Sequence, residues 1–288
     1  MERYKRVPWY LKILFKIILT RIPLNRRFWN RLGVFRHGRM VYPEYAYEVF
    51  MKHFLRSFPD RRMEGFVGLE LGPGDSLFSA LNVYASGGSG TYLVDVAPFA
   101  TEEVSSYKKM ADFLVFKGLP SPDLHDLSDL RDILRVCRAQ YGTSGLNSLR
   151  TIPPASVDFI WSQSVLQHVR KDEFIDLVDE MRRVIRPGGV CSHSVDLKDC
   201  LGGRLNNLRF SEKLWEGNLM ARSGFYTNRY RLSEILSIFK QKGFSAEILK
   251  LESWDNLPTL KNKLASKFRD FSEEDLLISG FDVILHPV

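Results

Sequence analysis

The chain has 288 residues, of which 44% are hydrophobic and 26% are charged, a composition typical of a soluble globular protein. This length is sufficient for one large α/β domain with an appendage. The three cysteines, Cys137, Cys191 and Cys200, are far apart and form no C-x-x-C pair. This spacing disfavours a disulfide framework or a structural zinc site, and it favours a reducing cytoplasm.

The net charge of +7 is concentrated in residues 1–40. This segment holds 11 of the 41 lysines and arginines and a single acid, Glu2, whereas the rest of the chain has 30 basic and 33 acidic residues. If the part of the chain after residue 40 bound nucleic acid, it would be expected to carry its own basic surface. The sequence therefore argues against nucleic acid as a partner.

Residues 1–40 are predicted to form a basic amphipathic arm. On a helix, Lys12 and Lys16 share one face, with Trp9 and Tyr10 at the entry. The opposite face is lined by Leu11, Leu14, Phe15, Ile18 and Ile22. Such a helix suits an anionic membrane surface, which predicts a cytoplasmic protein peripheral to the inner face of the membrane. The alternative is that the apolar face packs on the body or on a second subunit. A signal peptide is disfavoured, because lysines interrupt the apolar stretch and no A-x-A-like site follows it.

A lead-in helix is predicted over residues 41–64, where aromatic residues recur about once per turn. This aromatic stripe could cover a ligand pocket, although packing in the core is the commoner role. The stripe consists of Tyr47, Phe50, Phe54 and Phe58.

After this helix the sequence alternates between strands and helices, which is typical of a parallel sheet. The predicted strands are 66–70, 91–96, 157–161, 190–195, 245–251 and 281–285. The predicted helices are 75–86, 101–117, 126–141, 171–185 and 231–242. Residues 118–150 exceed what a crossover needs and are interpreted as an insertion within a domain spanning 65–288.

A glycine-rich turn, Glu70-Leu71-Gly72-Pro73-Gly74, follows the first predicted strand. Gly72 and Gly74 allow the backbone to turn sharply and to approach a ligand at the start of a helix. A nicotinamide-dinucleotide fingerprint would require a further glycine where this chain has Leu77, and Glu70 is foreign to that fingerprint. A dehydrogenase is therefore disfavoured. Asp95 ends the second strand 21 residues after Gly74, where an acid can bind the two hydroxyls of a ribose.

Two more motifs follow in order, SVDFIWSQSVLQHV from Ser156 and RRVIRPGGV from Arg182. With the glycine turn and Asp95, they make the sequence resemble the class I S-adenosylmethionine-dependent methyltransferases over residues 65–285. The resemblance implies a Rossmann-like α/β fold: a seven-stranded, mostly parallel sheet with an antiparallel last strand, helices on both faces, and the N-terminal helical arm added. It also implies S-adenosyl-L-methionine as cofactor.

On this resemblance, Glu70, Gly72 and Gly74 would cradle the methionine part of the cofactor, and Asp95 would bind the ribose. Ser162 and Gln163 would line the floor near the methyl group. Methylation of a nucleobase is disfavoured, because Ser162-Gln163-Ser164-Val165 replaces the [D/N/S]-P-P-[Y/F/W] tetrapeptide of related enzymes.

The C-terminal sequence also resembles methyltransferase-domain proteins of bacterial polysaccharide biosynthesis clusters. Residues 197–231 are interpreted as a substrate lid, in which aromatic, amide and arginine side chains could bind a sugar. The candidate substrate-binding residues are Arg209, Tyr226, Asn228 and Arg229.

An alcohol acceptor requires a general base, and His193 and His168 are the candidates. Asp196 could orient His193, or Asp196 and Asp199 could hold a divalent cation, although a structural role for either histidine remains an alternative. The predicted function is O-methylation of a sugar hydroxyl of a small molecule or glycan. The alternatives are methylation of a lipid or quinone-like precursor, and a catalytically inactive partner subunit that binds the cofactor.

Overall fold

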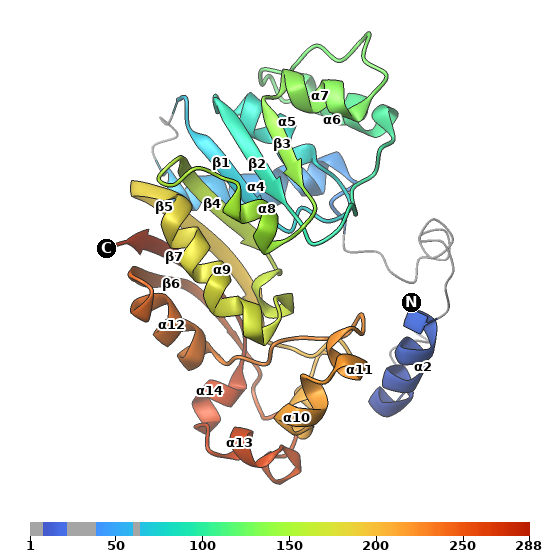
Figure 1. The fold of residues 1–288 in the computed structure, drawn as a ribbon, viewed down its shortest axis with the longest axis vertical. Coiled ribbons are helices and arrows are strands. Elements are labelled where there is room, and N and C mark those ends of the chain that lie inside the picture. Colours follow the sequence, from blue (N-terminus) through green and yellow to red (C-terminus); the bar gives the residue numbers. More distant parts are fainter. Residues whose placement is uncertain (1–7, 22–38, 60–63) are drawn as a thin grey trace.

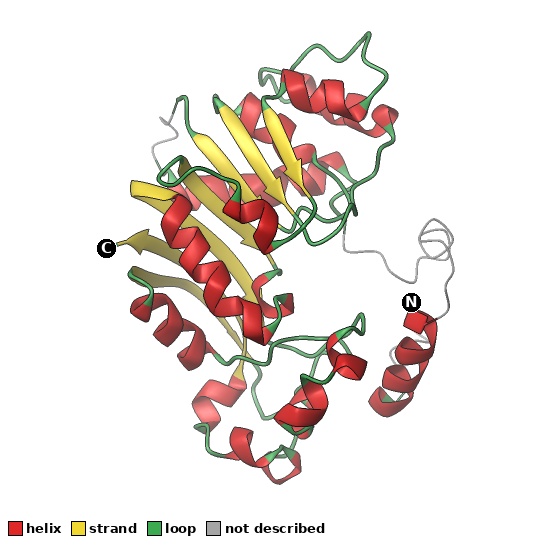
Figure 2. Ribbon diagram, in the orientation of Figure 1, coloured by secondary structure: helices red, strands yellow, loops and turns green. Residues whose placement is uncertain are grey.

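A seven-stranded sheet forms the centre of the chain in the computed structural model, which describes residues 8–21, 39–59 and 64–288 (Figures 1 and 2). The strand order is β3 (Ala139–Gly142), β2 (Gly90–Val94), β1 (Val67–Leu71), β4 (Val157–Gln163), β5 (Ile185–Asp196), β7 (Ile278–Pro287) and β6 (Phe244–Ser253). All pairings from β3 to β5 are parallel, and β7 runs antiparallel to both of its neighbours. The predicted fold is therefore confirmed.

Helices cover both faces of the sheet (Figure 1). One face packs against α4 (Pro43–Ser57), α5 (Phe78–Ala85) and α6 (Val104–Phe116), with α7 (Leu130–Val136) joining the same core. The other face packs against α8 (Leu146–Arg150), α9 (Lys171–Val184) and α12 (Leu232–Gln241). The sequence of α9 explains its packing on the sheet, because apolar residues recur there at three- and four-residue spacing. These residues are all buried: Phe174, Leu177, Val178 and Met181.

The lead-in helix α4 packs its aromatic stripe into the core. Phe50 contacts the rings of Phe159 and Trp161 on β4, and Phe54 contacts the ring of Phe159. The ring centroids of Phe58 and Phe159 are 5.4 Å apart. Because side chains alternate along a strand, Phe159 and Trp161 face α4, whereas Ile160 and Ser162 face the side of α9. The stripe therefore anchors α4 against β4 and leaves another side of this helix for Lys52 and Arg56.

Two chain segments form a small group of short helices beyond the sheet, which we call the lid because it contains the segment predicted as a lid; its action as a lid stays a prediction. The first holds η2 (Asn206–Arg209), α10 (Glu212–Trp215) and α11 (Asn218–Ala221), and the second holds η3 (Lys261–Lys263), α13 (Ser266–Arg269) and α14 (Glu273–Leu277). They share one apolar cluster, made by Leu205, Leu208, Leu264, Phe268 and Leu276. The predicted lid at 197–231 is thus only half of this substructure.

The N-terminal helix α2 (Trp9–Arg21) packs on the lid (Figure 1). Ile13 is buried against Trp215 and its neighbours, and Lys12 is only 5% exposed. Lys16 donates to the carbonyl of Cys200 at 3.4 Å. The lysines therefore lie toward the body, and the other face, at Leu11, Leu14, Phe15 and Ile18, is exposed. Ile22 and most of the basic arm lie outside the described residues. No described helix has the length and hydropathy to cross a bilayer.

The segment at 118–150 is not an insertion. The predicted helix at 126–141 ends as α7 at Val136, and Arg138, with φ of +52°, turns the chain into β3. β3 then pairs with β2 as the edge strand of the sheet. Helical periodicity misses this strand, because four residues of partly exposed Ala-Gln-Tyr-Gly give no alternation of apolar side chains.

Candidate active site

The glycine turn connects β1 to α5 at the carboxyl edge of the sheet. Gly72 and Gly74 both have φ of +69°, a conformation that favours glycine. A Cβ atom on Gly72 would lie 2.6 Å from Cγ2 of Val165, in the loop after β4. The turn therefore needs glycine for its backbone and for its close contact with that loop.

Asp95 lies beside this turn, as the sequence predicted for residues that share the carboxyl edge of parallel strands. Its Oδ2 accepts a hydrogen bond from Gly74 N at 3.1 Å, and its Oδ1 accepts from Val96 N at 2.7 Å. These two amides fix the orientation of the Asp95 side chain at the end of β2. A role in binding ribose stays a prediction.

Glu70 is buried behind the turn, on the face of the sheet that α5 covers. Burial raises the pKa of Glu70 to about 8, an effect opposed by hydrogen bonding from Ser79 and increased by the charge of Asp95. Within the described residues, Glu70 Oε2 has no partner in hydrogen-bond geometry. One oxygen of this carboxyl group, Oε2, is thus a buried acceptor without a partner among the described residues, adjoining the glycine turn.

Ser162 and His193 pair inside the core on the α9 side. Ser162 Oγ lies 2.7 Å from His193 Nδ1, and both side chains are fully buried. His193 Nε2 has no hydrogen-bond partner among the described residues, and burial lowers the pKa of His193 to about 3. In this conformation His193 cannot touch an acceptor, and Ser162 lines no open floor. Gln163, on the opposite face, does reach an open cavity.

This cavity, which we call the α4 cavity, lies between α4 and the carboxyl half of β5 and has a volume of about 210 Å³. Residues of α4, β4, β5, β6 and β7 line it. Lys52 Nζ donates to Gln163 Oε1 at 2.6 Å and to Ser194 Oγ at 2.8 Å. Ser194 in turn donates to Asp282, which pairs with Arg56 at 2.8 Å. One charged network therefore spans α4, β4, β5 and β7.

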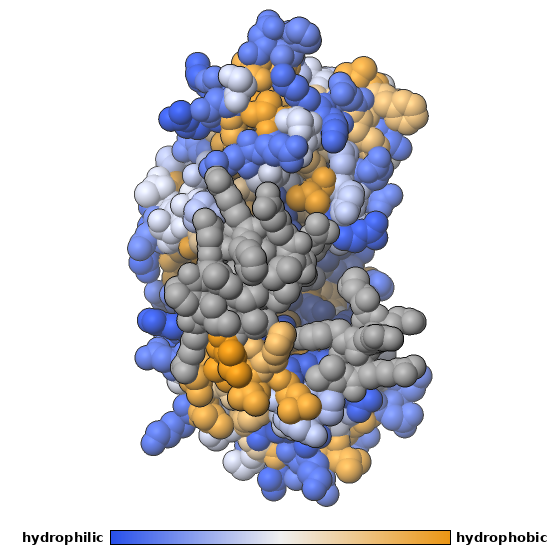
Figure 3. All heavy atoms as spheres, turned by 90° about the vertical axis from the view of Figure 1, so that its right-hand side faces the viewer, coloured by the Kyte–Doolittle hydropathy of each residue, from blue (hydrophilic) through white to orange (hydrophobic). Residues whose placement is uncertain are grey.

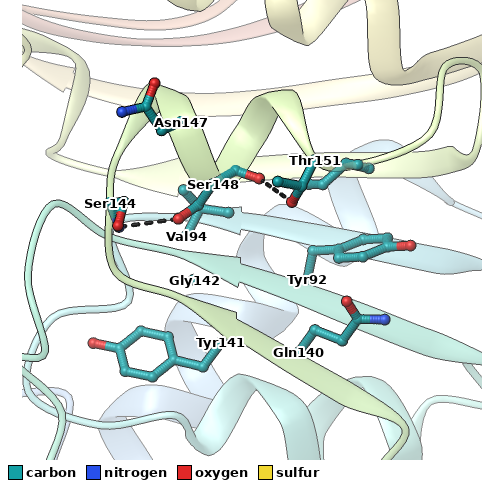
Figure 4. A pocket seen from close by; sticks show the side chains of 10 residues that line it. Tyr92, Val94, Gln140, Tyr141, Gly142, Ser144, Asn147, Ser148 and Thr151 are labelled. Atoms are coloured by element: carbon teal, nitrogen blue, oxygen red, sulfur yellow. Dashed lines mark hydrogen bonds between the residues drawn. The ribbon is translucent and has the colours of Figure 1, made fainter.

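A larger cavity, of about 370 Å³, opens elsewhere, between β2, β3 and α8 (Figure 4). It is lined by Tyr92, Gln140 and Ser144 among others, and Ser148 Oγ there accepts from Ser144 N at 2.9 Å. None of Glu70, Gly72, Gly74 or Asp95 lines it. Volume alone therefore does not locate the chemistry of this protein, and the glycine turn and the α4 cavity define the candidate active site.

A family model described as a methyltransferase domain matches residues 125–192, which contain β3, β4 and most of β5. The matched range includes the motifs that begin at Ser156 and Arg182, whereas the glycine turn and Asp95 precede it. The match supports the resemblance to S-adenosylmethionine-dependent methyltransferases that the sequence motifs indicate.

Solved methyltransferase structures resemble the chain at low identity. Phosphoethanolamine N-methyltransferase 2 of Haemonchus contortus is 16% identical, with a TM-score of 0.45, over 84% of this chain and 53% of that one. A methyltransferase of Methanosarcina mazei is 14% identical, with a TM-score of 0.48, over 80% of this chain and 96% of that one. This chain thus spans about half the length of the Haemonchus enzyme. No curated protein matches the sequence. These likenesses are too low to indicate a substrate.

The residues of the glycine turn fit S-adenosylmethionine as a cofactor. S-adenosylmethionine carries a sulfonium and an ammonium group, and two carboxyl groups, Glu70 and Asp95, lie at the turn. Gly72 and Gly74 would allow its methionine part to approach the backbone. We therefore expect these four residues to hold the cofactor, which supplies the methyl group.

The predicted substrate residues of the lid lie mostly inside it. Arg229 is buried, pairs with Glu212 and Glu216 at 3.3 and 3.5 Å, and donates to Phe210 O at 2.7 Å. Asn228 Nδ2 donates to the carbonyls of Leu166 and Val169 at 2.8 and 3.1 Å.

Two further lid residues make internal contacts. The Tyr226 hydroxyl donates to Glu216 at 2.7 Å, and Arg209 lies over the ring of Trp9. These contacts make Arg229, Asn228 and Tyr226 parts of the lid framework, and none of the four candidates lines the α4 cavity.

The structure shows the contacts of three polar residues that the sequence analysis singled out: Asp199, Asp196 and His168. Asp199 accepts from three backbone amides of residues 201–203 through Oδ1 and from Asn206 through Oδ2, so it organises the lid loop. Asp196 accepts from Lys198 N and does not contact His193, because the two side chains lie on opposite faces of β5. Asp196 therefore does not orient His193 in this structure, and the cation site at Asp196 and Asp199 stays a prediction. His168, in η1 (Leu166–His168), bonds the carbonyl of Tyr226 at 2.9 Å.

Sequence reasoning missed Lys52, His53 and Arg56. His53 is buried, with Nδ1 2.8 Å from Ser192 Oγ and Nε2 3.3 Å from Gln163 Oε1, and burial lowers its pKa to about 3. The signal was available in part, since Lys52 and Arg56 are four residues apart and share a helix face away from the aromatic stripe. Nothing in the sequence indicates that Asp282 would meet them.

Proposed function

We propose that this methyltransferase transfers a methyl group to a hydroxyl of a sugar, either free or in a lipid-linked glycan of polysaccharide biosynthesis. The observation that supports this proposal is the polar lining of the α4 cavity. Gln163 and Ser194 supply amide and hydroxyl groups, and Asp282 supplies a carboxylate. A sugar hydroxyl both donates and accepts hydrogen bonds, so it is matched by such a mixed set of partners.

The α4 cavity adjoins the glycine turn. Ser164 lines the cavity, and the next residue, Val165, contacts Gly72. Methyl transfer to an alcohol is an in-line displacement, in which the acceptor oxygen bonds the methyl carbon, the carbon–sulfur bond breaks and the hydroxyl proton leaves to a base. The chain's task is to align the acceptor, and side chains on three strands and a packed helix provide a rigid frame for this alignment.

Two histidines are the candidates for the general base. His193 could serve only after an opening of the core, because its ring is fully buried. His168 is partly buried beside the lid and uses Nδ1 for the carbonyl of Tyr226. A lipid or quinone-like acceptor is less well matched, because Val195 and Phe281 supply the only large apolar side chains of the α4 cavity among the described residues.

The test is transfer of a radiolabelled methyl group from S-adenosylmethionine to a panel of mono- and oligosaccharides, with isoprenoid alcohols and quinols as the comparison panel. Labelled sugar as the main product would support the proposal. Labelling of the quinols alone would contradict it. Binding of S-adenosylhomocysteine without transfer to any acceptor would indicate the inactive partner subunit.

We also propose that α2 attaches the enzyme to an anionic membrane surface. Leu11, Leu14, Phe15 and Ile18 are between 45% and 56% exposed, and their spacing places them on one face. Figure 3 shows apolar residues gathered on this side of the molecule. The basic residues of segment 1–40 other than Lys12 and Lys16, which lie toward the body, complement acidic lipids in charge.

Vesicle flotation tests the attachment. We expect the full chain to float with vesicles of phosphatidylglycerol and phosphatidylcholine more than with phosphatidylcholine alone. The double variant Leu14→Ser/Phe15→Ser should lose most of this binding, because it removes exposed apolar surface. The variant Ile175→Ser, at a residue of α9 that is 42% exposed, is the matched control. Equal flotation of the double variant and the wild type would contradict the proposal.

A further inference from the structure

The α4 cavity contains one cation more than its carboxylates can pair. Its charged lining consists of the cations Lys52, Arg56, Lys198 and Lys250 and the acids Asp196, Glu252 and Asp282. Each acid already has a cationic partner other than Lys52.

The separations are short. Arg56 lies 2.8 Å from Asp282, Lys250 lies 2.7 Å from Glu252, and Lys198 lies 3.4 Å from Asp196. Lys52 is therefore the cation of this cavity that lacks a carboxylate.

Lys52 is a half-buried ammonium group with neutral partners. Its two hydrogen bonds go to Gln163 and Ser194, and within the described residues no carboxylate lies within ion-pair distance of Nζ. An ammonium group has three donor hydrogens, so one remains for a ligand. Burial lowers the pKa of Lys52, with Arg56 and Lys250 acting in the same direction and Asp282 and Glu252 opposing them. Burial lowers the pKa of the neighbouring His53 to about 3, so its ring is neutral near pH 7 and adds no second positive charge.

The backbone at this cavity is strained, which is common at ligand sites. Ser164, at the end of β4, has φ of +55°, a left-handed conformation that costs a non-glycine residue about 1 kcal/mol or more. Its amide is held by the carbonyl of Ser194 at 2.8 Å. Ser164 lines the cavity in this conformation, and the next residue, Val165, contacts Gly72.

We propose that the α4 cavity binds an acidic group of the acceptor, a carboxylate or a phosphate, and that Lys52 is its principal ligand. This inference rests on the proposed function for the identity of the acceptor, but anion binding can be measured without methyl transfer. A cationic group would meet acids that are already paired, whereas an anion completes the coordination of Lys52 and adds no unpaired charge. The acceptor is thus an acidic sugar or a sugar phosphate.

Calorimetric titration of the full chain, saturated with S-adenosylhomocysteine, tests this assignment. The probes are D-glucuronate, inorganic phosphate and neutral D-glucose. We expect saturable binding of glucuronate or phosphate that is at least about tenfold tighter than binding of glucose, because a hydrogen bond between charged groups is lost with the neutral sugar. Glucuronate alone would identify a carboxylate as the ligand, and phosphate alone would identify a phosphate.

Lys52→Gln should weaken binding of the anion at least about tenfold and leave binding of S-adenosylhomocysteine unchanged, whereas Lys240→Gln, on the exposed side of α12, should change neither. Equal affinity for the three probes, or full anion affinity in Lys52→Gln, would overturn the assignment.

If Lys52→Gln does not fold, the assignment is tested on the wild type by chemical acetylation of its lysines, with and without the anion, followed by mass spectrometry. Protection of Lys52 by the anion supports the proposal and unchanged acetylation overturns it. Anion binding without methyl transfer to any sugar would refute the proposed function alone.

Discussion

The proposed cofactor side and the proposed acceptor side of this site are built from different structural elements. On the cofactor side, residues 70–95 supply backbone turns, positive-φ glycines and two carboxyl groups at the ends of adjacent strands. On the acceptor side, charged side chains from α4, β5, β6 and β7 meet although they are up to 230 residues apart, as Lys52 and Asp282 illustrate.

This difference explains which half can be recognised in a sequence. A turn motif keeps its residues together along the chain, so its spacing carries the signal. A side-chain network is assembled only by folding, and its members look like ordinary surface charges until the sheet brings them together. Four changes sharpen or break this comparison.

Arg229→Met should have the largest effect on stability, because it leaves Glu212 and Glu216 of the lid without their buried partner. We expect a loss of about 3–5 kcal/mol in the free energy of unfolding, measured by urea denaturation. Arg222→Met, at an exposed position of the same lid, should stay within about 0.5 kcal/mol of the wild type. A small effect of Arg229→Met on the free energy of unfolding would contradict the structural role of Arg229 in the lid and would favour a role in substrate binding.

Glu70→Gln should change how stability depends on pH. The pKa of Glu70 is about 8 in the folded protein and near 4.5 in the unfolded chain, so the wild type loses stability as pH rises from about 4.5 to 8. The glutamine variant lacks this loss, and at pH 9 it should be more stable by about 2–4 kcal/mol.

Thermal unfolding from pH 5 to 9 would show this difference. Identical pH profiles for both proteins would contradict the burial argument. His53 and His193 act in the opposite sense, since their depressed pKa values of about 3 destabilise the fold as pH falls below about 6.5.

Gly72→Ala should damage the cofactor side selectively. The added Cβ would lie 2.6 Å from Val165 Cγ2, at a backbone φ that already disfavours alanine. Strain of about 1–3 kcal/mol would lower the affinity for S-adenosylhomocysteine by roughly 10–100-fold. Gly118→Ala has a similar φ of +71° but open space around its Cβ, so it isolates the backbone effect and should leave affinity unchanged. Equal affinity in both variants would refute the steric argument.

Asp95→Asn should weaken cofactor binding by about tenfold. The uncharged side chain of asparagine accepts hydrogen bonds from the ribose hydroxyls, and from the backbone N–H groups of Gly74 and Val96, less strongly than a carboxylate does. Calorimetry with S-adenosylhomocysteine measures this loss, and Asp112→Asn, exposed on α6, serves as its control. If Asp95→Asn binds normally, Asp95 is a structural cap of the turn and the ribose site lies elsewhere.

Tertiary structure revised several predictions made from local patterns. Periodicity placed α9 and the strands within a few residues, but it turned β3 into the end of a helix, because a short edge strand buries too little to alternate. The amphipathic pattern of α2 correctly grouped Leu11, Leu14, Phe15 and Ile18, yet it could not predict that Lys12 would face the body. The histidine at 193 looked accessible in the sequence and is fully buried, because alternation alone does not say which face of a central strand is covered.

The sequence by itself determined the α/β architecture, the glycine turn with Asp95 and the cofactor. These features depend on residues close together in the chain and on the period of apolar side chains. The tertiary structure decided the charged α4 cavity, the burial of His193 and the docking of α2 on the lid. Each of these depends on which distant side chains a packed sheet and its helices bring within a few ångströms, and no local pattern encodes that distance.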